Sequence, residues 1–178
     1  GIYKYGTLEN KIKYIICQDE QFKKSNVCVS VNVGSLSDPI EYQGLAHFLE
    51  HMLFLGSEKY PEENYFDKMV KKGGGSMNAY TDIFETVYYF DILNDNLEHA
   101  LDVFSRFFID PKFDKNSVDR EINAINSEHR KNVNNDMWRI NQVIKNKQAI
   151  YDLKVDKTVN KIGNGSMLEK FEINKLPN

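Results

Sequence analysis

One run, GLAHFLEHML at residues 44–53, limits what this chain can fold into more than any other feature. Its apolar residues recur at helical spacing, which predicts an amphipathic helix that ends near Gly56. Residues four apart lie one above the other on a helix, so His47 and His51 can reach a single metal ion, with Glu50 beside them. Two imidazoles and a carboxylate in the order H-x-x-E-H predict a zinc site at which Glu50 acts on water.

Composition and charge exclude several classes of partner. The 178 residues are 41% hydrophobic and 28% charged, which is typical of one globular domain. A net charge of -3 provides no basic surface, so we expect no nucleic acid as a partner. No apolar run has membrane-spanning length, so we expect no membrane partner. We expect a cytoplasmic location, although the absence of a signal peptide decides little because the sequence begins at Gly1 and not at methionine.

The two cysteines, Cys17 and Cys28, fall in predicted strands that a hairpin connection would bring close together. Two cysteines in a chain of this size do not make a disulfide framework, so we interpret them as buried, reduced thiols. This interpretation favours a reducing compartment.

Hydrophobic patterning predicts a mixture of strands and helices. We predict strands at 12–17, 27–33, Ser76–Thr81 and Thr86–Leu93, and helices at 45–55, 61–72, 97–108, 118–133 and 137–147. A short polar connection predicts that the first two strands are antiparallel neighbours, and the last two form a second pair. The expected fold class is α+β, an antiparallel-rich sheet with helices packed on one face.

Two of these helices have a predicted core face. In the first helix, Leu49 lies on the core face, whereas Glu50 lies on the opposite side with the two histidines. In the helix at 97–108, Leu101 and Phe108 belong to the core face, and His99 lies on the solvent side. We therefore interpret His99 as a residue that binds no metal.

A catalytic zinc ion usually has three protein ligands, so two histidines leave one ligand to be found elsewhere. The predicted helix at 118–133 carries Glu121 and Glu128, which are seven residues apart and therefore lie on one helix face. One of the two can bind the metal while the other supports the ligands. His129 is rotated about a hundred degrees from Glu128 and is interpreted as a non-ligand.

Two segments, HFLEH at 47–51 and DREINAINSEHRKN at 119–132, together resemble the insulysin branch of the pitrilysin-type inverzincin metallopeptidases. The resemblance extends over most of the chain as far as about Lys147. In this family the glutamate of the E-H-x-K-N element is the third zinc ligand, and it matches Glu128. An upstream glutamate that orients the ligands matches Glu121.

The resemblance implies a role for each residue of the site. One zinc ion per domain is held by His47, His51 and Glu128. Glu50 takes a proton from the attacking water and later passes a proton to the leaving amine. The implied function is that of a zinc metalloendopeptidase that hydrolyses peptides and small unfolded polypeptides.

The predicted strand Ser76–Thr81 has two interpretations. A strand at the edge of a sheet can receive an extended peptide, backbone to backbone, with little demand on its sequence. The family uses the matching segment in this way, so the resemblance implies that Asn78, Ala79 and Tyr80 contact the peptide substrate. The alternative is an ordinary edge strand.

The resemblance also implies that the site needs more of the protein. Enzymes of this family consist of four similar domains in two halves that close around the substrate. We therefore expect residues 1–178 to form a single, partial N-terminal domain whose partner is the C-terminal half of the same polypeptide. A homo-oligomer is a further possible partner. We expect this piece to bind zinc but to show little or no peptidase activity alone.

Two alternatives belong to other functional classes. The first is a non-catalytic interaction or scaffold domain that keeps the fold, and the four intact active-site positions argue against it. The second is a structural zinc site, which requires a fourth protein ligand, and no cysteine lies at a suitable spacing.

Overall fold

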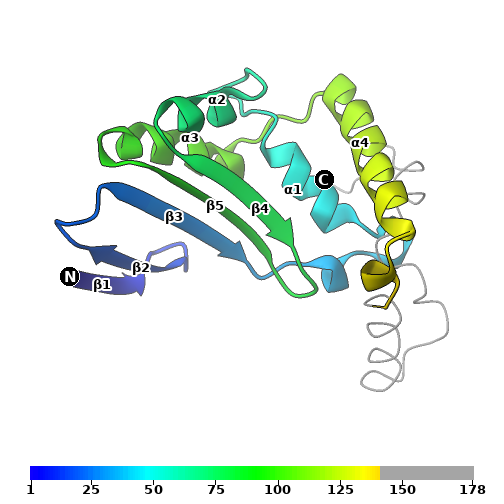
Figure 1. Ribbon diagram of the computed structural model, residues 1–178, viewed down its shortest axis with the longest axis horizontal. Coiled ribbons are helices and arrows are strands. Elements are labelled where there is room, and N and C mark those ends of the chain that lie inside the picture. Colours follow the sequence, from blue (N-terminus) through cyan, green and yellow to red (C-terminus); the bar gives the residue numbers. More distant parts are fainter. Residues whose placement is uncertain (141–178) are drawn as a thin grey trace.

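The computed structural model describes residues 1–140 and shows a small sheet covered by helices on one face (Figure 1). The strands are β1 (Ile2–Thr7), β2 (Lys13–Gln18), β3 (Lys24–Val31), β4 (Ser76–Thr81) and β5 (Thr86–Leu93). The α-helices are α1 (Leu45–Leu53), α2 (Tyr65–Lys72), α3 (Leu97–Ile109) and α4 (Lys115–Val133). The predicted α+β class, with antiparallel strands and helices on one face, is confirmed.

The central sheet has the strand order β3-β5-β4, and both pairings are antiparallel. β5 contributes Tyr88, Phe90 and Ile92 to the core, which explains why its sequence is rich in aromatic and β-branched residues. Alternate residues of β3 pack against the same core, in agreement with the period of two in its sequence. β4 lies at one edge of this sheet and pairs with β5 along its whole length.

Helices α2 and α3 cover the face of the sheet on which β5 places these aromatic rings (Figure 1). Phe66 of α2 contacts Phe90 edge-on at 5.4 Å between ring centroids and stacks on Phe104 of α3 at 5.6 Å. Burial of each such side chain contributes about 1.5–3 kcal/mol to the free energy of folding. The aromatic cluster therefore fixes α2 and α3 on the sheet.

The predicted core face of α3 is partly wrong. Leu101 and Phe108 are exposed, with exposed fractions of 41% and 40%. The buried stripe of this helix consists instead of Ala100, Val103, Phe104 and Phe107. Because the apolar stripe of α3 contains more residues than the sheet buries, the sequence does not determine which of them meet the sheet.

The pairing of the first strands also differs from the prediction. β2 pairs with β1, for which no strand was predicted, and β3 pairs with β5. The predicted hairpin of β2 and β3 is therefore wrong, because the aromatic face of β5, far along the chain, is the partner that completes the core. Cys17 and Cys28 are free and exposed, so their interpretation as buried thiols is also wrong.

Helix boundaries follow local backbone chemistry. α2 begins at Tyr65 instead of Pro61, since Asn64 has a positive φ of 62° that cannot continue a helix. α4 begins at Lys115, because the Asp114 side chain accepts hydrogen bonds from the first free backbone N–H groups. Part of the helix predicted at 137–147 lies outside the described residues.

The turn from α2 into β4 depends on a close backbone approach. A Cβ atom at Gly75 would lie 1.8 Å from the carbonyl oxygen of Asp91 in β5, so only glycine fits where β4 begins. Asp91 then accepts hydrogen bonds from both the backbone N–H and the hydroxyl of Ser76. This junction sets the register of β4.

In the described part of the chain, no helix has the length and apolar character needed to cross a bilayer.

Candidate metal centre

The start of α1 is fixed by a side chain from the preceding loop. Gly44 has a φ of 95°, a conformation that glycine adopts without steric cost, and offers no capping side chain. The Asp38 carboxylate supplies the cap instead, accepting from the backbone N–H groups of Gly44 at 2.7 Å and Ala46 at 2.9 Å. Burial raises the pKa of Asp38, and these backbone hydrogen bonds oppose that rise.

Helix α1 packs against α4 through an apolar contact. Phe48 and Met52 meet Val118, Ile122 and Ile125 of α4 in a second core cluster. The predicted faces of α1 need a correction at two positions, since Leu49 is 42% exposed and Glu50 is only 8% exposed. The helix is rotated so that Glu50 faces β4 and both histidines face α4.

This packing brings His47, His51 and Glu128 together. Their nitrogen and oxygen atoms lie within 4.8 Å of one another, although Glu128 is 77 positions away from His51. The Nε2 atoms of His47 and His51 are 3.2 Å apart. Glu128 Oε2 lies 3.9 Å from His47 Nε2 and 3.8 Å from His51 Nε2. Ligands of a tetrahedral zinc ion with bonds of about 2.0–2.1 Å stand about 3.3–3.4 Å apart. The distance between the two histidine nitrogens matches this separation, and the two distances to Glu128 are about 0.5 Å longer, so the donor set is close to a zinc-binding arrangement.

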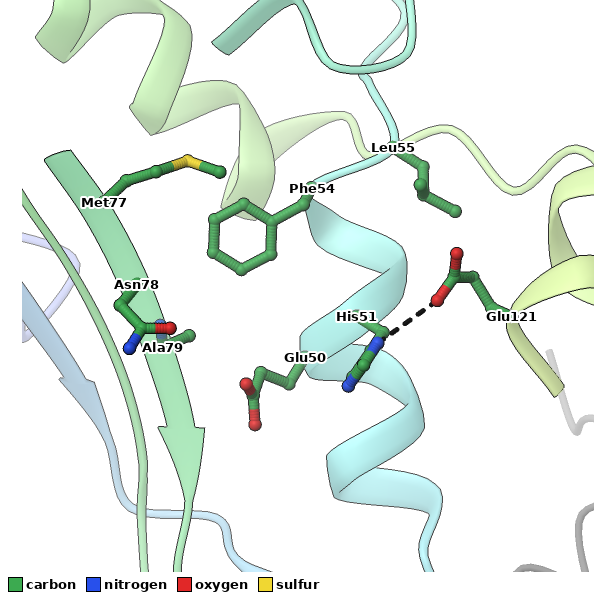
Figure 2. Close-up of a pocket in the computed structure, with 8 residues that line it drawn as sticks. All are labelled: Glu50, His51, Phe54, Leu55, Met77, Asn78, Ala79 and Glu121. Carbon is green, nitrogen blue, oxygen red and sulfur yellow. Dashed lines mark hydrogen bonds and ion pairs between the residues drawn. The ribbon is translucent and has the colours of Figure 1, made fainter. Parts of the chain in front are cut away.

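A hydrogen bond fixes the orientation of the His51 ring. Its Nδ1 lies 3.1 Å from Glu121 Oε2 (Figure 2). A carboxylate accepts hydrogen bonds, so Nδ1 donates in this pair, and Nε2, which lies near His47 and Glu128, is the nitrogen left to bind a metal. This hydrogen bond raises the pKa of His51. Burial lowers the pKa of His47, and the charge of His51 lowers it further. Glu121 is thus placed to orient one histidine, and Glu128 lies at the opening of the cluster.

The Glu50 carboxylate points toward β4, whereas the His51 ring points toward Glu121 (Figure 2). The hydroxyl of Thr81 in β4 donates a hydrogen bond to its Oε2 at 2.6 Å. Beside it lies a pocket of about 310 Å³ lined by Glu50, His51, Phe54, Leu55, Met77, Asn78, Ala79 and Glu121. Of the three predicted substrate contacts, Asn78 and Ala79 line this pocket, whereas the side chain of Tyr80 is 47% exposed and does not.

Two residues that position the site were not predicted from sequence. Asp38 lies in the loop before α1, and its signal in the sequence was an acidic residue shortly before a helix that lacks its own capping side chain. Thr81 was predicted only as a strand end, although the period of two places it on the same face as Ala79. The residues interpreted as non-ligands, His99 and His129, lie outside the cluster.

Comparison with known proteins agrees with this geometry. The family model described as "Insulinase (Peptidase family M16)" matches residues 13–148, which cover both segments of the candidate site. The chain belongs to the insulinase family. Insulinase-family relatives include the A-factor-processing enzyme of Saccharomyces cerevisiae and the insulin-degrading enzyme of Homo sapiens, each 48% identical over 143 residues. These matches cover 80% of this chain and 14% of each relative.

Two further proteins match over a longer stretch or in structure. The insulin-degrading enzyme of Drosophila melanogaster is 44% identical over 176 residues, which is 99% of this chain and 17% of the relative. The crystal structure of pitrilysin matches with a TM-score of 0.75 and 39% identity over 80% of this chain and 15% of pitrilysin. The chain therefore spans about one seventh to one sixth of the length of these relatives.

Proposed function

We propose that this chain is the zinc-binding catalytic domain of a metallopeptidase. The observation that carries the proposal is the convergence of His47, His51 and Glu128. Glu50 directly precedes His51 on α1, so its carboxylate is close to this cluster. Membership of a peptidase family supports the reaction class. One zinc ion bound by these three residues would leave a coordination position open, as a catalytic site requires.

Each side chain has a separate task in this proposal. Zinc, when bound, supplies a Lewis acid that lowers the pKa of water and polarises the scissile carbonyl. Glu50 accepts the proton of the attacking water and returns a proton to the leaving amine. Glu121 holds His51 in the tautomer that directs Nε2 to the metal.

The substrate class in the proposal is peptides and small unfolded polypeptides. β4 is an edge strand of the three-stranded sheet, so within the described residues one side of its backbone has no strand partner. An extended peptide that pairs with this edge would pass Asn78, Ala79 and Tyr80 and reach the pocket beside Glu50. Main-chain pairing would give affinity with little sequence preference.

We further propose that the domain works with a C-terminal half of the same polypeptide. The relatives are about seven times longer than the matched region, and a lone domain leaves Glu128 47% exposed at the opening of the cluster. Residues 1–178 alone should then bind zinc and turn over little peptide. A scaffold role is the alternative, and the complete ligand set disfavours it.

A cytoplasmic location stays a prediction, since one relative from Arabidopsis thaliana has "peroxisomal" in its name.

Metal content and coordination test the proposal directly. We expect one zinc per chain, and X-ray absorption spectra that fit two imidazoles, one carboxylate and one water. A metal-free protein, or a fourth protein ligand, would contradict a catalytic site. Peptide cleavage by the full-length protein, compared with residues 1–178 alone, tests the partner half. Robust cleavage by residues 1–178 that Glu50→Gln abolishes would overturn the requirement for that half.

A further inference from the structure

The hydrogen bond between Thr81 and Glu50 joins the β4 edge to the metal-binding helix. Thr81 Oγ1 donates to Glu50 Oε2 at 2.6 Å, which is at the short end of the range for hydrogen bonds between oxygen atoms. Glu50 is only 8% exposed, so water can do little to orient this carboxylate. A buried carboxylate needs hydrogen-bond donors, and Thr81 is therefore a main determinant of where the Glu50 oxygens lie.

The neighbouring hydroxyl does not compete for this role. Thr86 lies directly opposite Thr81 in the β4–β5 ladder, and the two hydroxyl oxygens are 3.4 Å apart. Each hydroxyl has one proton to donate. Thr86 donates its proton to the carbonyl oxygen of Val33 at 2.8 Å, so the proton of Thr81 is available to Glu50.

The position of Thr81 on β4 gives the contact its consequence. Met77, Ala79 and Thr81 alternate along β4 on its half-buried face, and α1 packs against this strand. Thr81 directly follows Asn78, Ala79 and Tyr80, the segment proposed to pair with a peptide. Glu50 is thus held by the same rigid strand that would set the register of the substrate.

We infer that Thr81 is a positioning residue that fixes the Glu50 carboxylate relative to the scissile bond of a peptide on β4. The inference rests on the proposed role of Glu50 as the base. A carboxylate without this donor can rotate about its side-chain torsions within the pocket. A displacement of about 1 Å in a reacting group can cost on the order of 100-fold in rate.

The test is a set of single substitutions in the full-length protein. Thr81→Val replaces the hydroxyl by a methyl group of nearly the same size, and should lower kcat by about 10- to 100-fold. KM and zinc content should stay within about twofold of wild type, because the ligands and the β4 backbone are unchanged. Thr81→Ser restores the donor and should recover most of kcat.

Thr86→Val is the matched control. It removes a hydroxyl from the adjacent ladder position and leaves the Val33 carbonyl without its donor. This change should lower the midpoint of thermal unfolding while kcat stays close to wild type, since Thr81 can still donate to Glu50. Glu50→Gln provides the reference for loss of the base.

The outcomes separate this inference from the proposed function. If Thr81→Val retains wild-type kcat while Glu50→Gln is inactive, Thr81 does not position the base, and the peptidase proposal stands. Equal losses of kcat in Thr81→Val and Thr86→Val, or no recovery in Thr81→Ser, would also overturn the inference. If Glu50→Gln cleaves peptides like wild type, the proposed function fails and the role of Thr81 fails with it.

Discussion

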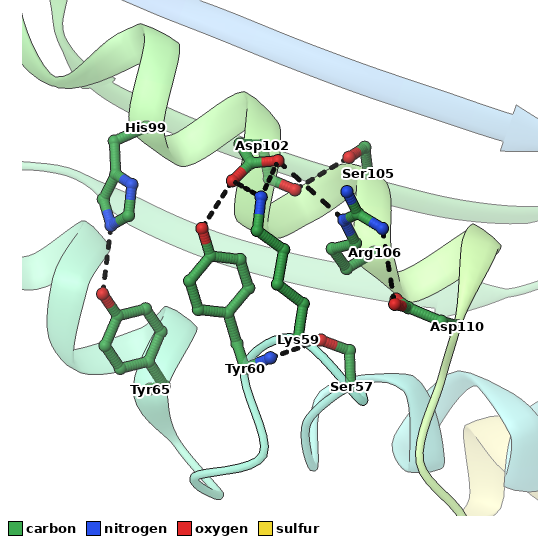
Figure 3. A network of polar contacts seen from close by, with 9 residues as sticks. All are labelled: Ser57, Lys59, Tyr60, Tyr65, His99, Asp102, Ser105, Arg106 and Asp110. Atoms are coloured by element: carbon green, nitrogen blue, oxygen red, sulfur yellow. Dashed lines mark hydrogen bonds and ion pairs between the residues drawn. The ribbon is translucent and has the colours of Figure 1, made fainter.

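Two polar clusters of this protein contain similar residue types but differ in their balance of donors and acceptors. The first is the candidate metal centre between α1 and α4, which is called the metal centre below. The second, the α3 network, consists of Lys59, Tyr60, Tyr65, His99 and Asp102 (Figure 3). It lies where α3 meets the start of α2 and the segment before it. There Asp102 accepts hydrogen bonds from Lys59 at 2.7 Å and from Tyr60 at 2.5 Å, and the Tyr65 hydroxyl pairs with His99 at 3.0 Å.

The metal centre has the opposite arrangement. His47, His51 and Glu128 direct a nitrogen or oxygen lone pair at the same small volume, and no lysine or arginine is among them. Acceptors that face one another repel unless a proton or a cation lies between them. A histidine beside acidic residues is therefore not enough for a metal site. What distinguishes the candidate site is the convergence of three ligand atoms on one small volume.

Glu50→Gln should produce the largest difference between the two clusters. We expect peptide hydrolysis by the full-length protein to fall by at least about 100-fold, because the general base is lost, while zinc content stays unchanged. Glu98→Gln, at an exposed position in the first turn of α3, is the matched control and should keep full activity. Loss of zinc in Glu50→Gln would instead assign Glu50 to the ligands.

Histidine substitutions test the two clusters directly. His51→Ala should lower zinc affinity by more than the 10- to 100-fold that loss of an outer partner typically costs, because it removes a ligand. His99→Ala, in the α3 network, should leave zinc affinity unchanged. Competition with a chromophoric chelator measures both. A parallel loss in the two variants would mean that the α3 network contributes to metal binding.

Glu121→Gln should have an intermediate effect on zinc affinity. The amide can keep a hydrogen bond to His51 but carries no charge, so it orients the ring less strongly. We expect a loss of about 10- to 100-fold in affinity with the stoichiometry of one zinc retained. A complete loss of zinc would show that Glu121, and not Glu128, is the third ligand.

The part of the site that lies on one helix could be predicted from sequence. His47, Glu50 and His51 are close because of helix geometry alone, and the helical spacing of Glu121 and Glu128 places both on one face. The choice of Glu128 as the ligand came from the family resemblance, since periodicity does not distinguish the two. The structure brings Glu128 to the histidines and Glu121 to the far nitrogen of His51.

Contacts between distant segments could not be predicted. Thr81 meets Glu50 only because α1 packs on β4, and Asp38 reaches the start of α1 from a loop. The pairing of β3 with β5 depends on which aromatic face completes the core, which local spacing does not record. The same reason accounts for the wrong assignment of Leu49, whose exposure depends on how α1 sits between β4 and α4.

The smallest expected effect lies in the α3 network. Hydrogen bonds from Lys59 and then Tyr60 hold the pKa of Asp102 below its ordinary value. A carboxylate with a lowered folded-state pKa contributes stability above its unfolded pKa of about 3.9, and this contribution is lost as pH falls through the folded-state value. Asp102→Asn should therefore lower the midpoint of thermal unfolding slightly at pH 7, and the gap from wild type should close as pH falls below about 4.

Zinc affinity should be the same in Asp102→Asn and wild type, because this carboxylate already has its donors and lies outside the metal cluster. Calorimetry across pH measures the gap, and Lys59→Met should reproduce its direction at pH 7 by removing the main donor. A gap that stays constant down to low pH would mean that Asp102 stabilises the fold through packing and not through its charge. The α3 network would then act through packing, whereas the metal centre acts through the charges and lone pairs of its ligands.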